Sequence, residues 1–317
     1  MSKKVLVTLP LTEEQKAWLE AQPDPEAGCE FIYKPDAEVT ADDVKDLDAV
    51  IGCIKPAYLK EAEHLKLVQL HSAGYETYAA PGVLRDDCVL CNASGAYGLA
   101  VSEHMLAMTF DLLRHFGGYH KHQEQHLWKE TGLYSSVEGS TVVVLGLGDI
   151  GGDYARKVKA CGAYVIGVRK DASKPKPDYV DEQVDDSALD AVLPRADILA
   201  MVVPGGPATH HILSAERLKA MKDQSIIINV GRGNAIDSIA LKALLRAGKF
   251  YGVGLDVTEP EPLPADDELW DCERVLITPH AAGRFFLPET VKRILKIAGK
   301  NLGAWSRGEA LMNVIER

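Results

Sequence analysis

The sequence has no excess of basic residues and no long apolar run, and each absence excludes a class of protein. Its 35 lysines and arginines are outnumbered by 46 aspartates and glutamates, so the net charge is −11 at pH 7. Such a surface repels the phosphates of nucleic acid and of anionic lipid, and we expect neither as a partner. No apolar stretch approaches the roughly 20 residues that cross a membrane. The N-terminus also lacks the apolar core and cleavage site of a secretory signal, so we expect a cytoplasmic protein.

Cysteine is also scarce, with six in 317 residues, which is not a disulfide framework. Cys88 and Cys91 have CxxC spacing, but their apolar run is typical of a strand, where residues three apart face opposite sides. We therefore expect buried thiols and no redox site. His122 and His126 have helical spacing, yet no nearby acid or cysteine cluster supports a metal site there. The sequence predicts no bound metal.

The length favours about two domains, and the apolar runs alternate with helical stretches. Five short strands are expected in the first ninety or so residues, at 5–9, 31–33, 48–52, 67–71 and 88–91. A long helix is expected over 99–116, followed by a polar stretch to Ser136. Six more strands are expected at 141–145, 164–168, 197–203, 225–230, 251–257 and 275–278, with a last helix at about 288–306. Alternation of this kind predicts parallel, doubly wound α/β sheets.

The second series opens on a glycine-rich turn. A buried strand ending at Leu145 continues into G-x-G-x-x-G, formed by Gly146, Gly148 and Gly151, and a helical pattern follows. Within a strand–helix–strand unit this is a dinucleotide-binding fingerprint. Gly146 allows the tight turn, Gly148 the approach of a pyrophosphate, and Gly151 close helix packing. Free N–H groups at the helix N-terminus would bind the phosphates.

The next strand ends at Val168 and is followed by Arg169 and Lys170. Arg169 occupies the place where an acid would bind the ribose hydroxyls of NAD. A basic pair there suits a 2′-phosphate and indicates NADP(H). The alternative is a solvated charge pair beside bound NAD(H).

Three later strands end in segments that carry Arg232, Glu261 and His280. Ligands of open α/β sheets bind outside the carboxyl ends of the strands, so these side chains could converge beside a nicotinamide. Histidine can donate a proton near neutral pH, and a carboxylate neighbour would hold its ring. A guanidinium can bind a substrate carboxylate and polarise a ketone. Taken singly, each residue could instead be a cap, a loop acid or a turn residue.

These motifs occur together and in order: the fingerprint, Asn-Val-Gly-Arg-Gly at 229–233, Leu-Asp-Val with Glu-Pro at 255–262, and Pro-His at 279–280. The chain thereby resembles the D-isomer-specific 2-hydroxyacid dehydrogenase family over nearly its whole length. Within it, the sequence is similar to phosphoglycerate-dehydrogenase-like proteins and glyoxylate/hydroxypyruvate reductases. The resemblance implies two Rossmann-like domains with a cleft between them. A dinucleotide-binding domain, 93–284, would be inserted into a catalytic domain, 1–92 and 285–317.

The resemblance also implies individual roles. The catalytic residues would be Arg232, Glu261 and His280. The cofactor would bind Gly146, Gly148, Asp149, Ile150, Gly151, Arg169, Lys170, Val203, Pro204, Val230, Gly231, Asp256, His280 and Gly283. The substrate would bind Lys55, the backbone N–H groups of Ser72, Ala73 and Gly74, and Arg232.

Some of these roles have alternatives. Lys55 could select the substrate side chain or be a solvated lysine. Asp256 could bond the nicotinamide amide or cap its strand. Tyr97 and Arg284 are weaker candidates near the cleft. The region His115–His126 would lie near the interface of a homodimer, by resemblance.

We therefore expect an oxidoreductase that transfers a hydride between a nicotinamide cofactor, NADP(H) before NAD(H), and a small 2-oxoacid or D-2-hydroxyacid. Glyoxylate and hydroxypyruvate are the expected kind of substrate. One alternative is a nicotinamide-sensing regulator, like the transcriptional corepressors that share this fold. Another is a dehydrogenase of a larger metabolite, which would differ only in the loops of the first domain.

Overall fold

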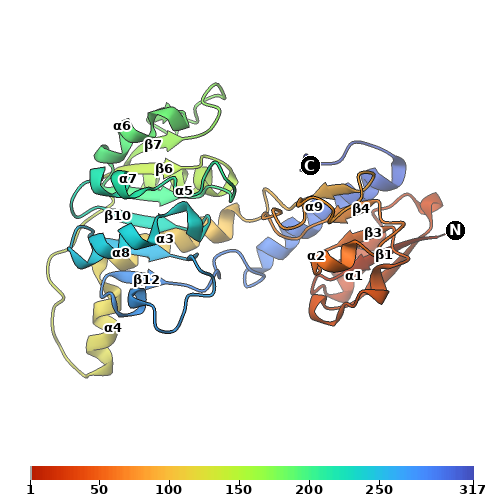
Figure 1. Ribbon diagram of the computed structural model, residues 1–317, viewed down its shortest axis with the longest axis horizontal. Helices are drawn as coiled ribbons and strands as arrows, with labels where there is room; N and C mark the ends of the chain where they lie inside the picture. Colours follow the sequence, from red (N-terminus) through yellow and green to blue (C-terminus); the bar gives the residue numbers. More distant parts are fainter. Residues whose placement is uncertain (1) are drawn as a thin grey trace. The chain divides into compact units, whose positions relative to one another are not determined.

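The computed structural model describes residues 2–317, which form two compact units (Figure 1). The outer unit comprises Met1–Tyr97 and Phe285–Arg317, and the inserted unit comprises Gly98–Arg284. The inserted unit therefore interrupts the outer unit in the sequence. None of the helices described within residues 2–317 combines the length and apolarity needed to cross a bilayer.

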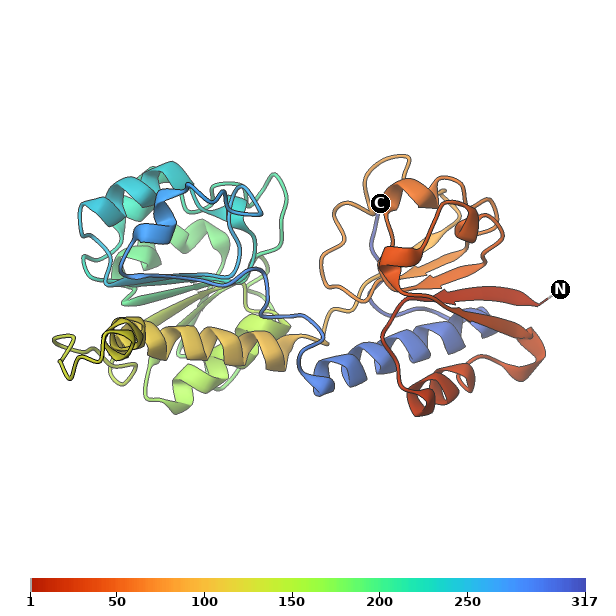
Figure 2. The same cartoon turned by 90° about the horizontal axis from the view of Figure 1, so that it is seen from below.

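The outer unit contains a five-stranded parallel sheet in the order β2-β1-β3-β4-β5. Its strands are β1 (Lys3–Val7), β2 (Cys29–Tyr33), β3 (Ala49–Ile51), β4 (Leu67–Gln69) and β5 (Val89–Cys91). Its helices are α1 (Glu13–Glu20), α2 (Pro56–Leu59) and α9 (Pro288–Arg307). Helices α1 and α9 lie on the same face of the sheet (Figure 2).

Local sequence explains these two helices. Thr12 begins α1 with a capping box, since its hydroxyl accepts from Gln15 N–H while the Gln15 side chain accepts from Thr12 N–H. Helix α9 buries an apolar stripe that includes Ile294 and Leu302. A Cβ at Gly299 would lie 2.6 Å from the Trp18 ring, so glycine there allows α1 and α9 to pack closely.

The inserted unit contains a seven-stranded parallel sheet in the order β12-β11-β10-β9-β6-β7-β8. Its strands are β6 (Thr141–Leu145), β7 (Tyr164–Val168), β8 (Glu182–Val184), β9 (Ile198–Met201), β10 (Ile226–Asn229), β11 (Gly252–Leu255) and β12 (Val275–Ile277). Its helices are α3 (Gly98–Arg114), α4 (Phe116–Glu124), α5 (Asp149–Ala160), α6 (Leu189–Val192), α7 (Ala215–Ala220) and α8 (Ser238–Arg246). Helices α3 and α5 pack together on one face, and α8 lies on the other (Figure 2).

The predicted doubly wound parallel α/β class is confirmed in both units. All residues of β9, β10 and β11 are buried, as expected for central strands covered on both faces. The thiols of Cys88 and Cys91 are free and buried as predicted. Burial raises the pKa of Cys88 to about 11 and that of Cys91 to about 12.

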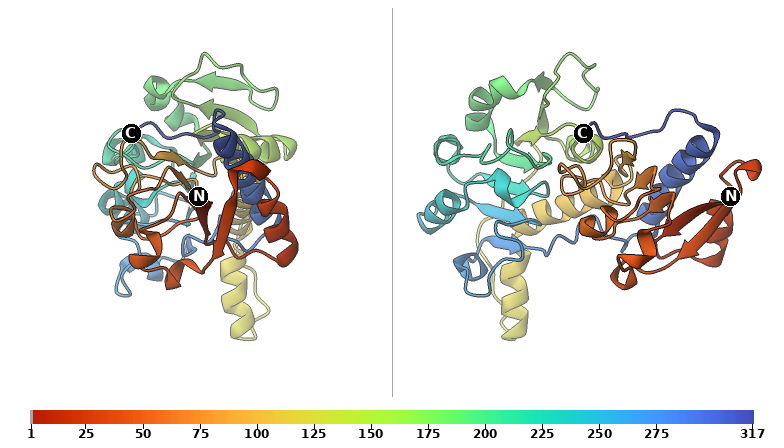
Figure 3. Two further views of the ribbon diagram at one scale, coloured as in Figure 1. Left: turned by 90° about the vertical axis from the view of Figure 1, so that its right-hand side faces the viewer. Right: turned by 45° about the vertical axis from the view of Figure 1, so that its right-hand side comes forward.

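Two elements differ from the sequence-based expectation. The region that begins at Gly117 and Gly118, predicted only as a polar stretch, starts within α4, which has no buried residue and hence no apolar periodicity to detect. Helix α4 projects from the body of the inserted unit (Figure 3). Strand β8 was also not predicted, because it is a short, half-buried edge strand of sequence Glu-Gln-Val.

Candidate active site

The predicted residues of the inserted unit lie in the segments that follow its parallel strands. Because carboxyl ends of parallel strands share one edge of a sheet, the loops after β6, β7, β9, β10, β11 and β12 all leave from the same edge. Contacts between these loops show which of the predicted residues are brought together.

The turn from β6 into α5 has the geometry that a dinucleotide phosphate needs. Gly146 has φ 101°, and a Cβ there would lie 2.7 Å from the Val202 carbonyl oxygen. A Cβ at Gly151 would lie 1.9 Å from the Gly146 carbonyl oxygen, so neither position accepts a side chain. A Cβ at Gly148 would instead meet nothing within 4 Å among the described residues. No side chain caps α5, so its first N–H groups are left for a ligand, and together with the open turn they fit a pyrophosphate.

Asp149 and Ile150 form the first turn of α5. The Asp149 carboxylate accepts a 2.7 Å hydrogen bond from Gly98 N–H, so this side chain joins α5 to the start of α3. The structure therefore leaves the backbone N–H of Asp149, and not its carboxylate, for the predicted contact with phosphate.

The loops after β9 and β10 touch the fingerprint loop and each other. A Cβ at Gly231 would lie 2.6 Å from the Val203 carbonyl oxygen. Val203 and Val230 are buried, whereas Pro204 is exposed. The buried Asn229 side chain donates to the Arg232 carbonyl at 2.9 Å and accepts from Gly231 N–H at 3.0 Å. Sequence reasoning missed Asn229 as the residue that shapes this turn, although it belongs to the Asn-Val-Gly-Arg-Gly motif.

The backbone of Arg232 is extended, and the next residue, Gly233, lies against the backbone of Thr258. Arg232 Nη1 donates to the Gly231 carbonyl at 2.8 Å, and the residue is half-buried. A Cβ at Gly233 would lie 2.0 Å from the Thr258 carbonyl oxygen. The segment of Arg232 therefore packs against the segment that leads to Glu261.

Glu261 and His280, which are 19 residues apart, meet directly. His280 Nδ1 lies 2.6 Å from Glu261 Oε1, and both side chains are nearly half exposed, at 47% and 44%. Because a carboxylate can only accept, Nδ1 carries the hydrogen and donates it. His280 Nε2 is thus left as the ring atom that can exchange a proton with a ligand.

Asp256 fixes the backbone on both sides of His280. Its carbonyl accepts from His280 N–H at 2.8 Å, and its carboxylate accepts from Ala281 N–H at 2.8 Å and from Ala282 N–H. The Thr278 hydroxyl also donates to this carboxylate, at 2.6 Å. Of the two roles predicted for Asp256, capping describes these contacts. The side chain is only 2% exposed, and its contact with a nicotinamide stays a prediction.

Three neighbours complete the turn. Thr278 uses its hydrogen for Asp256, so its oxygen accepts from His104 Nε2 on α3, at 3.0 Å. Arg284 Nε donates to the His280 carbonyl at 3.2 Å, which places Arg284 beside the turn. Gly283 lies within it and is half-buried. Sequence reasoning missed His104 because it lies on α3, whereas its partner Thr278 follows β12, far away in the sequence.

The end of β7 presents two cations. Arg169 N–H donates to the Val184 carbonyl at 3.1 Å, which fixes the backbone, and its side chain is half-exposed. Lys170 is exposed. Within residues 2–317, neither side chain makes a hydrogen bond or an ion pair. The nearby Asp171 carboxylate accepts from the N–H and hydroxyl of Ser173, which lowers its pKa.

In the outer unit, the loop after β4 is held in a shape that exposes N–H groups. The Ser72 hydroxyl donates to the Gly74 carbonyl at 2.6 Å, and Asn92 donates to the Ala73 carbonyl at 2.7 Å. The Tyr97 hydroxyl donates to the His71 carbonyl at 2.5 Å. Within residues 2–317, the N–H groups of Ala73 and Gly74 donate to no protein acceptor, whereas Ser72 N–H bonds the Cys53 sulfur. Successive free N–H groups of this kind suit an anion.

Lys55 precedes α2 and is exposed, with its ammonium 5.6 Å from the centre of the Tyr58 ring. That contact orients the lysine without burying it, and both predicted roles remain predictions.

Comparison with known proteins identifies the family. The family model described as "D-isomer specific 2-hydroxyacid dehydrogenase, NAD binding domain" matches residues 106–282, more than half of the chain. The chain belongs to the D-isomer specific 2-hydroxyacid dehydrogenase family. The predicted membership is confirmed, and with it the prediction of a nicotinamide-dependent oxidoreductase.

Relatives in this family match along most of the chain. A glyoxylate reductase of Korarchaeum cryptofilum is 28% identical over 296 residues, covering 89% of this chain and 87% of that protein. A family crystal structure from Aeromonas salmonicida is 29% identical with a TM-score of 0.86, covering 100% and 99% of the two chains. The NADPH-dependent glyoxylate/hydroxypyruvate reductase of Sinorhizobium meliloti, solved with NADP and sulfate, is 27% identical with a TM-score of 0.81, covering 99% and 98%.

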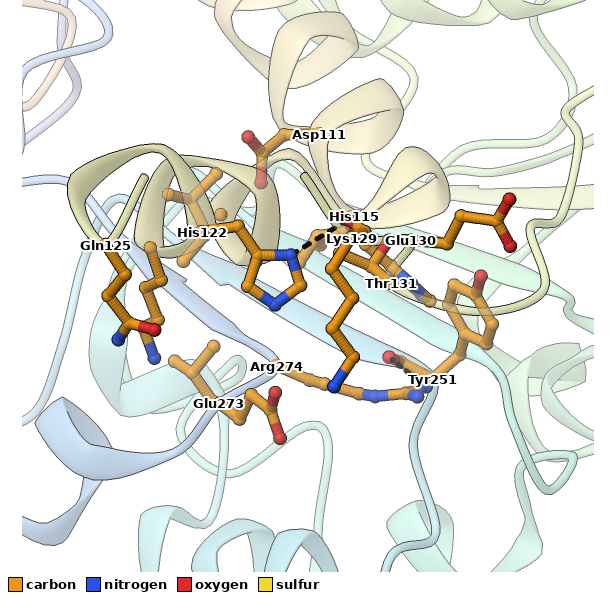
Figure 4. Close-up of a pocket in the computed structure, with 16 residues that line it drawn as sticks. Asp111, His115, His122, Gln125, Lys129, Glu130, Thr131, Tyr251, Glu273 and Arg274 are labelled. Atoms are coloured by element: carbon orange, nitrogen blue, oxygen red, sulfur yellow. Dashed lines mark hydrogen bonds between the residues drawn. The ribbon is translucent and has the colours of Figure 1, made fainter. Parts of the chain in front are cut away.

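A pocket of about 410 Å³ in this family member lies away from these residues (Figure 4). It is lined by the end of α3, α4, the segment after α4, Tyr251 and the start of β12 with the residues before it, and its polar lining includes Lys129 and Arg274. His122, which also lines the pocket, has its Nδ1 3.0 Å from the Lys129 carbonyl oxygen (Figure 4). Because no predicted catalytic, cofactor or substrate residue lines this pocket, it is separate from the candidate active site.

Proposed function

We propose that this family member is a cytoplasmic, NADPH-dependent reductase of small 2-oxoacids such as glyoxylate and hydroxypyruvate, forming D-2-hydroxyacids. The hydrogen bond between His280 Nδ1 and Glu261 Oε1 carries the proposal. This pair lies at the same sheet edge as the open turn at Gly148, which supports a role for His280 as the proton donor beside the cofactor. The printed activities of the Korarchaeum and Sinorhizobium relatives support this substrate class.

The reduction needs a hydride at C2 and a proton at the carbonyl oxygen. Bound NADPH supplies the hydride. His280 Nε2 donates the proton, while Glu261 holds the ring through Nδ1 and balances the positive charge of the imidazolium. Arg232 binds the substrate carboxylate and polarises the ketone with its guanidinium. In the reverse direction, His280 Nε2 accepts the hydroxyl proton.

We assign the dinucleotide to the inserted unit and the substrate side to the outer unit, as the sequence predicts for 93–284 and for 1–92 with 285–317. The two free N–H groups at Ala73 and Gly74 support this assignment, because they suit a carboxylate oxygen. Lys55 follows β3 in the same unit and is the proposed determinant of side-chain selectivity.

The preference for NADP(H) rests on Arg169 and Lys170. Their side chains make no hydrogen bond or ion pair within residues 2–317, and the carboxylate of Asp171, which Arg169 also attracts, accepts two hydrogen bonds from Ser173. The end of β7 therefore offers two cations to an adenosine ribose, and one oxygen of the nearby Asp171 carboxylate is occupied by Ser173. That combination favours a 2′-phosphate over two free hydroxyls.

Oxidation of NADPH, followed by its absorbance, tests the proposal with glyoxylate, hydroxypyruvate, pyruvate and bulkier 2-oxoacids. We expect turnover of at least one small 2-oxoacid, and its loss in His280→Ala. A preference for a bulky 2-oxoacid would assign a larger metabolite as substrate. Binding of NADPH without turnover of any member of the panel would contradict the proposal and favour a sensor.

We further propose a homodimer formed through α4 and the segment after it, the arm 116–134. Leu133 in this arm is 92% exposed, and Trp128 is fully exposed. Exposed apolar side chains concentrated on one projection are typical of an interface. Light scattering should show that Trp128→Glu with Leu133→Glu weakens the dimer. The same change at Ile239 on α8, which is 81% exposed, serves as the control. A monomeric wild type would contradict this assembly.

A further inference from the structure

Two loops at the carboxyl edge of the inserted sheet bring together a second group of ligating side chains. Among residues 2–317, His210, His211 and Glu259 each place one ligand atom within 4.8 Å of the others. The histidines follow β9, and Glu259 follows β11. The predicted catalytic residues are not part of this cluster.

The side chains of the cluster already face one another. The rings of His210 and His211 are stacked, with their centroids 4.0 Å apart and their planes 23° apart. His211 Nε2 lies 3.6 Å from Glu259 Oε2, which is an ion-pair distance but too long for a hydrogen bond. The two partly exposed imidazoles thus lie beside one carboxylate. Their ring nitrogens and the carboxylate oxygens can bind a shared ligand.

The backbone holds both loops in place. His211 has φ 49°, a left-handed conformation that few non-glycine residues adopt. Its N–H donates to the Asn234 carbonyl at 2.8 Å, and Leu213 N–H donates to the Ala235 carbonyl at 2.9 Å. On the other side, Gly233 packs directly against Thr258, the residue before Glu259. The segment 232–235 therefore joins the histidine loop to the glutamate loop.

We propose that His210, His211 and Glu259 form a binding site for a divalent transition-metal ion, with Zn²⁺ as its representative. Two imidazoles and one carboxylate are a ligand set of zinc sites that leave a fourth position for water. Calcium and magnesium need oxygen ligands almost exclusively, so this set excludes them. Zinc bonds of about 2.0–2.1 Å place tetrahedral ligand atoms about 3.3 Å apart. The three ligand atoms now lie within 4.8 Å of one another. Because the side chains are partly exposed, they can rotate and bring these atoms to the shorter separation.

This site departs from the sequence-based expectation that the chain binds no metal. Adjacent histidines without a nearby acid carry little signal, and Glu259 is far from them in the sequence. Only the contact of both loops with segment 232–235 makes the three side chains neighbours. The inference is independent of the proposed reductase activity, since metal binding is measured without a substrate.

Titration of the full chain with Zn²⁺, by calorimetry against a competing chelator, tests the proposal. We expect one strong equivalent in the wild type. His210→Ala and Glu259→Gln should each weaken it by about tenfold or more, as should His211→Asn, in which asparagine tolerates the left-handed backbone. His120→Ala, an exposed histidine of α4, and His280→Ala serve as controls that should leave the affinity unchanged. Loss of binding in His280→Ala would assign the metal to the His280–Glu261 pair and overturn the proposal.

X-ray absorption of the zinc-loaded protein provides a second readout that does not depend on a variant. We expect a first shell of nitrogen and oxygen only, with the outer scattering of two imidazoles. Sulfur in the first shell would assign the ion to a cysteine. Either that result or the absence of a strong equivalent would overturn the proposal.

Discussion

The proposed preference for NADPH over NADH rests mainly on the side chain of Arg169. Arg169 follows the last residue of β7, and its N–H is fixed by the Val184 carbonyl at 3.1 Å. Arg169→Asp therefore changes the side chain while the backbone stays in place. It removes a cation that would pair with a 2′-phosphate and adds an acceptor for the ribose hydroxyls.

The expected size of the cofactor preference follows from the exposure of the Arg169 side chain. A well-formed charge-assisted hydrogen bond contributes about 1.5–3 kcal/mol. Arg169 is half-exposed, so water and salt reduce its attraction to phosphate toward the lower end of that range. About 1.4 kcal/mol is a factor of ten. We therefore expect the wild type to prefer NADPH by about tenfold in kcat/KM at moderate salt, and the variant to prefer NADH.

Steady-state kinetics with both cofactors, at low and high salt, measure this ratio. The wild-type preference should shrink as salt rises, because the contact is exposed. Lys174→Asp is the matched control, since it makes the same charge change at an exposed position of the same loop. It should move the ratio far less. A wild-type preference for NADH, or equal shifts in the two variants, would refute the role of Arg169.

Further predictions concern catalysis and stability. His280→Ala should lower kcat for reduction by roughly a hundredfold or more with little change in cofactor affinity; near-normal turnover would remove it as the proton donor. Arg232→Lys keeps the charge but loses the planar fork, so kcat/KM should fall by a factor equivalent to about 2 kcal/mol, and tolerance of lysine would exclude bidentate binding. Burial alone would raise the pKa of Asp153, but hydrogen bonds from Lys157, Arg156 and a serine hydroxyl lower it to about 2. Its ionised form is thus stabilising above the ordinary aspartate pKa of about 3.9, and this contribution is lost as pH falls through the folded value. Asp153→Asn should lower the melting temperature at neutral pH by an amount that shrinks between about pH 4 and pH 2; a constant difference would contradict this.

The strands could be predicted from the sequence because most of them lie inside covered parallel sheets. β10 is buried along its whole length, so it appears as an uninterrupted apolar run. β8 has no buried residue and α4 has none, so neither leaves a periodic pattern. Secondary structure was therefore predictable where it contributes to a core and was missed where it lies at an edge or projects.

The candidate site was predictable for a different reason. Arg232, Glu261 and His280 each follow a strand, and parallel topology alone brings such positions to one edge. The residues that shape the turns could not be found this way. Asn229 acts through hydrogen bonds to Gly231 and Arg232 that depend on the local fold.

The role of Asp256 is the clearest example of a feature that strand topology does not predict. An acid at a strand end can cap a turn or bind a ligand, and both roles use the same chemistry, a carboxylate that accepts N–H or O–H bonds. The sequence offers no way to choose, because the donors lie more than twenty residues away, at Thr278, Ala281 and Ala282. Since the carboxylate is 2% exposed and already accepts from all three, its measurable effect should be on the position of His280. Two neighbouring strand ends thus supply the proposed proton donor and the buried acid that holds its backbone in place, and both belong to motifs that the sequence shows without revealing their contact.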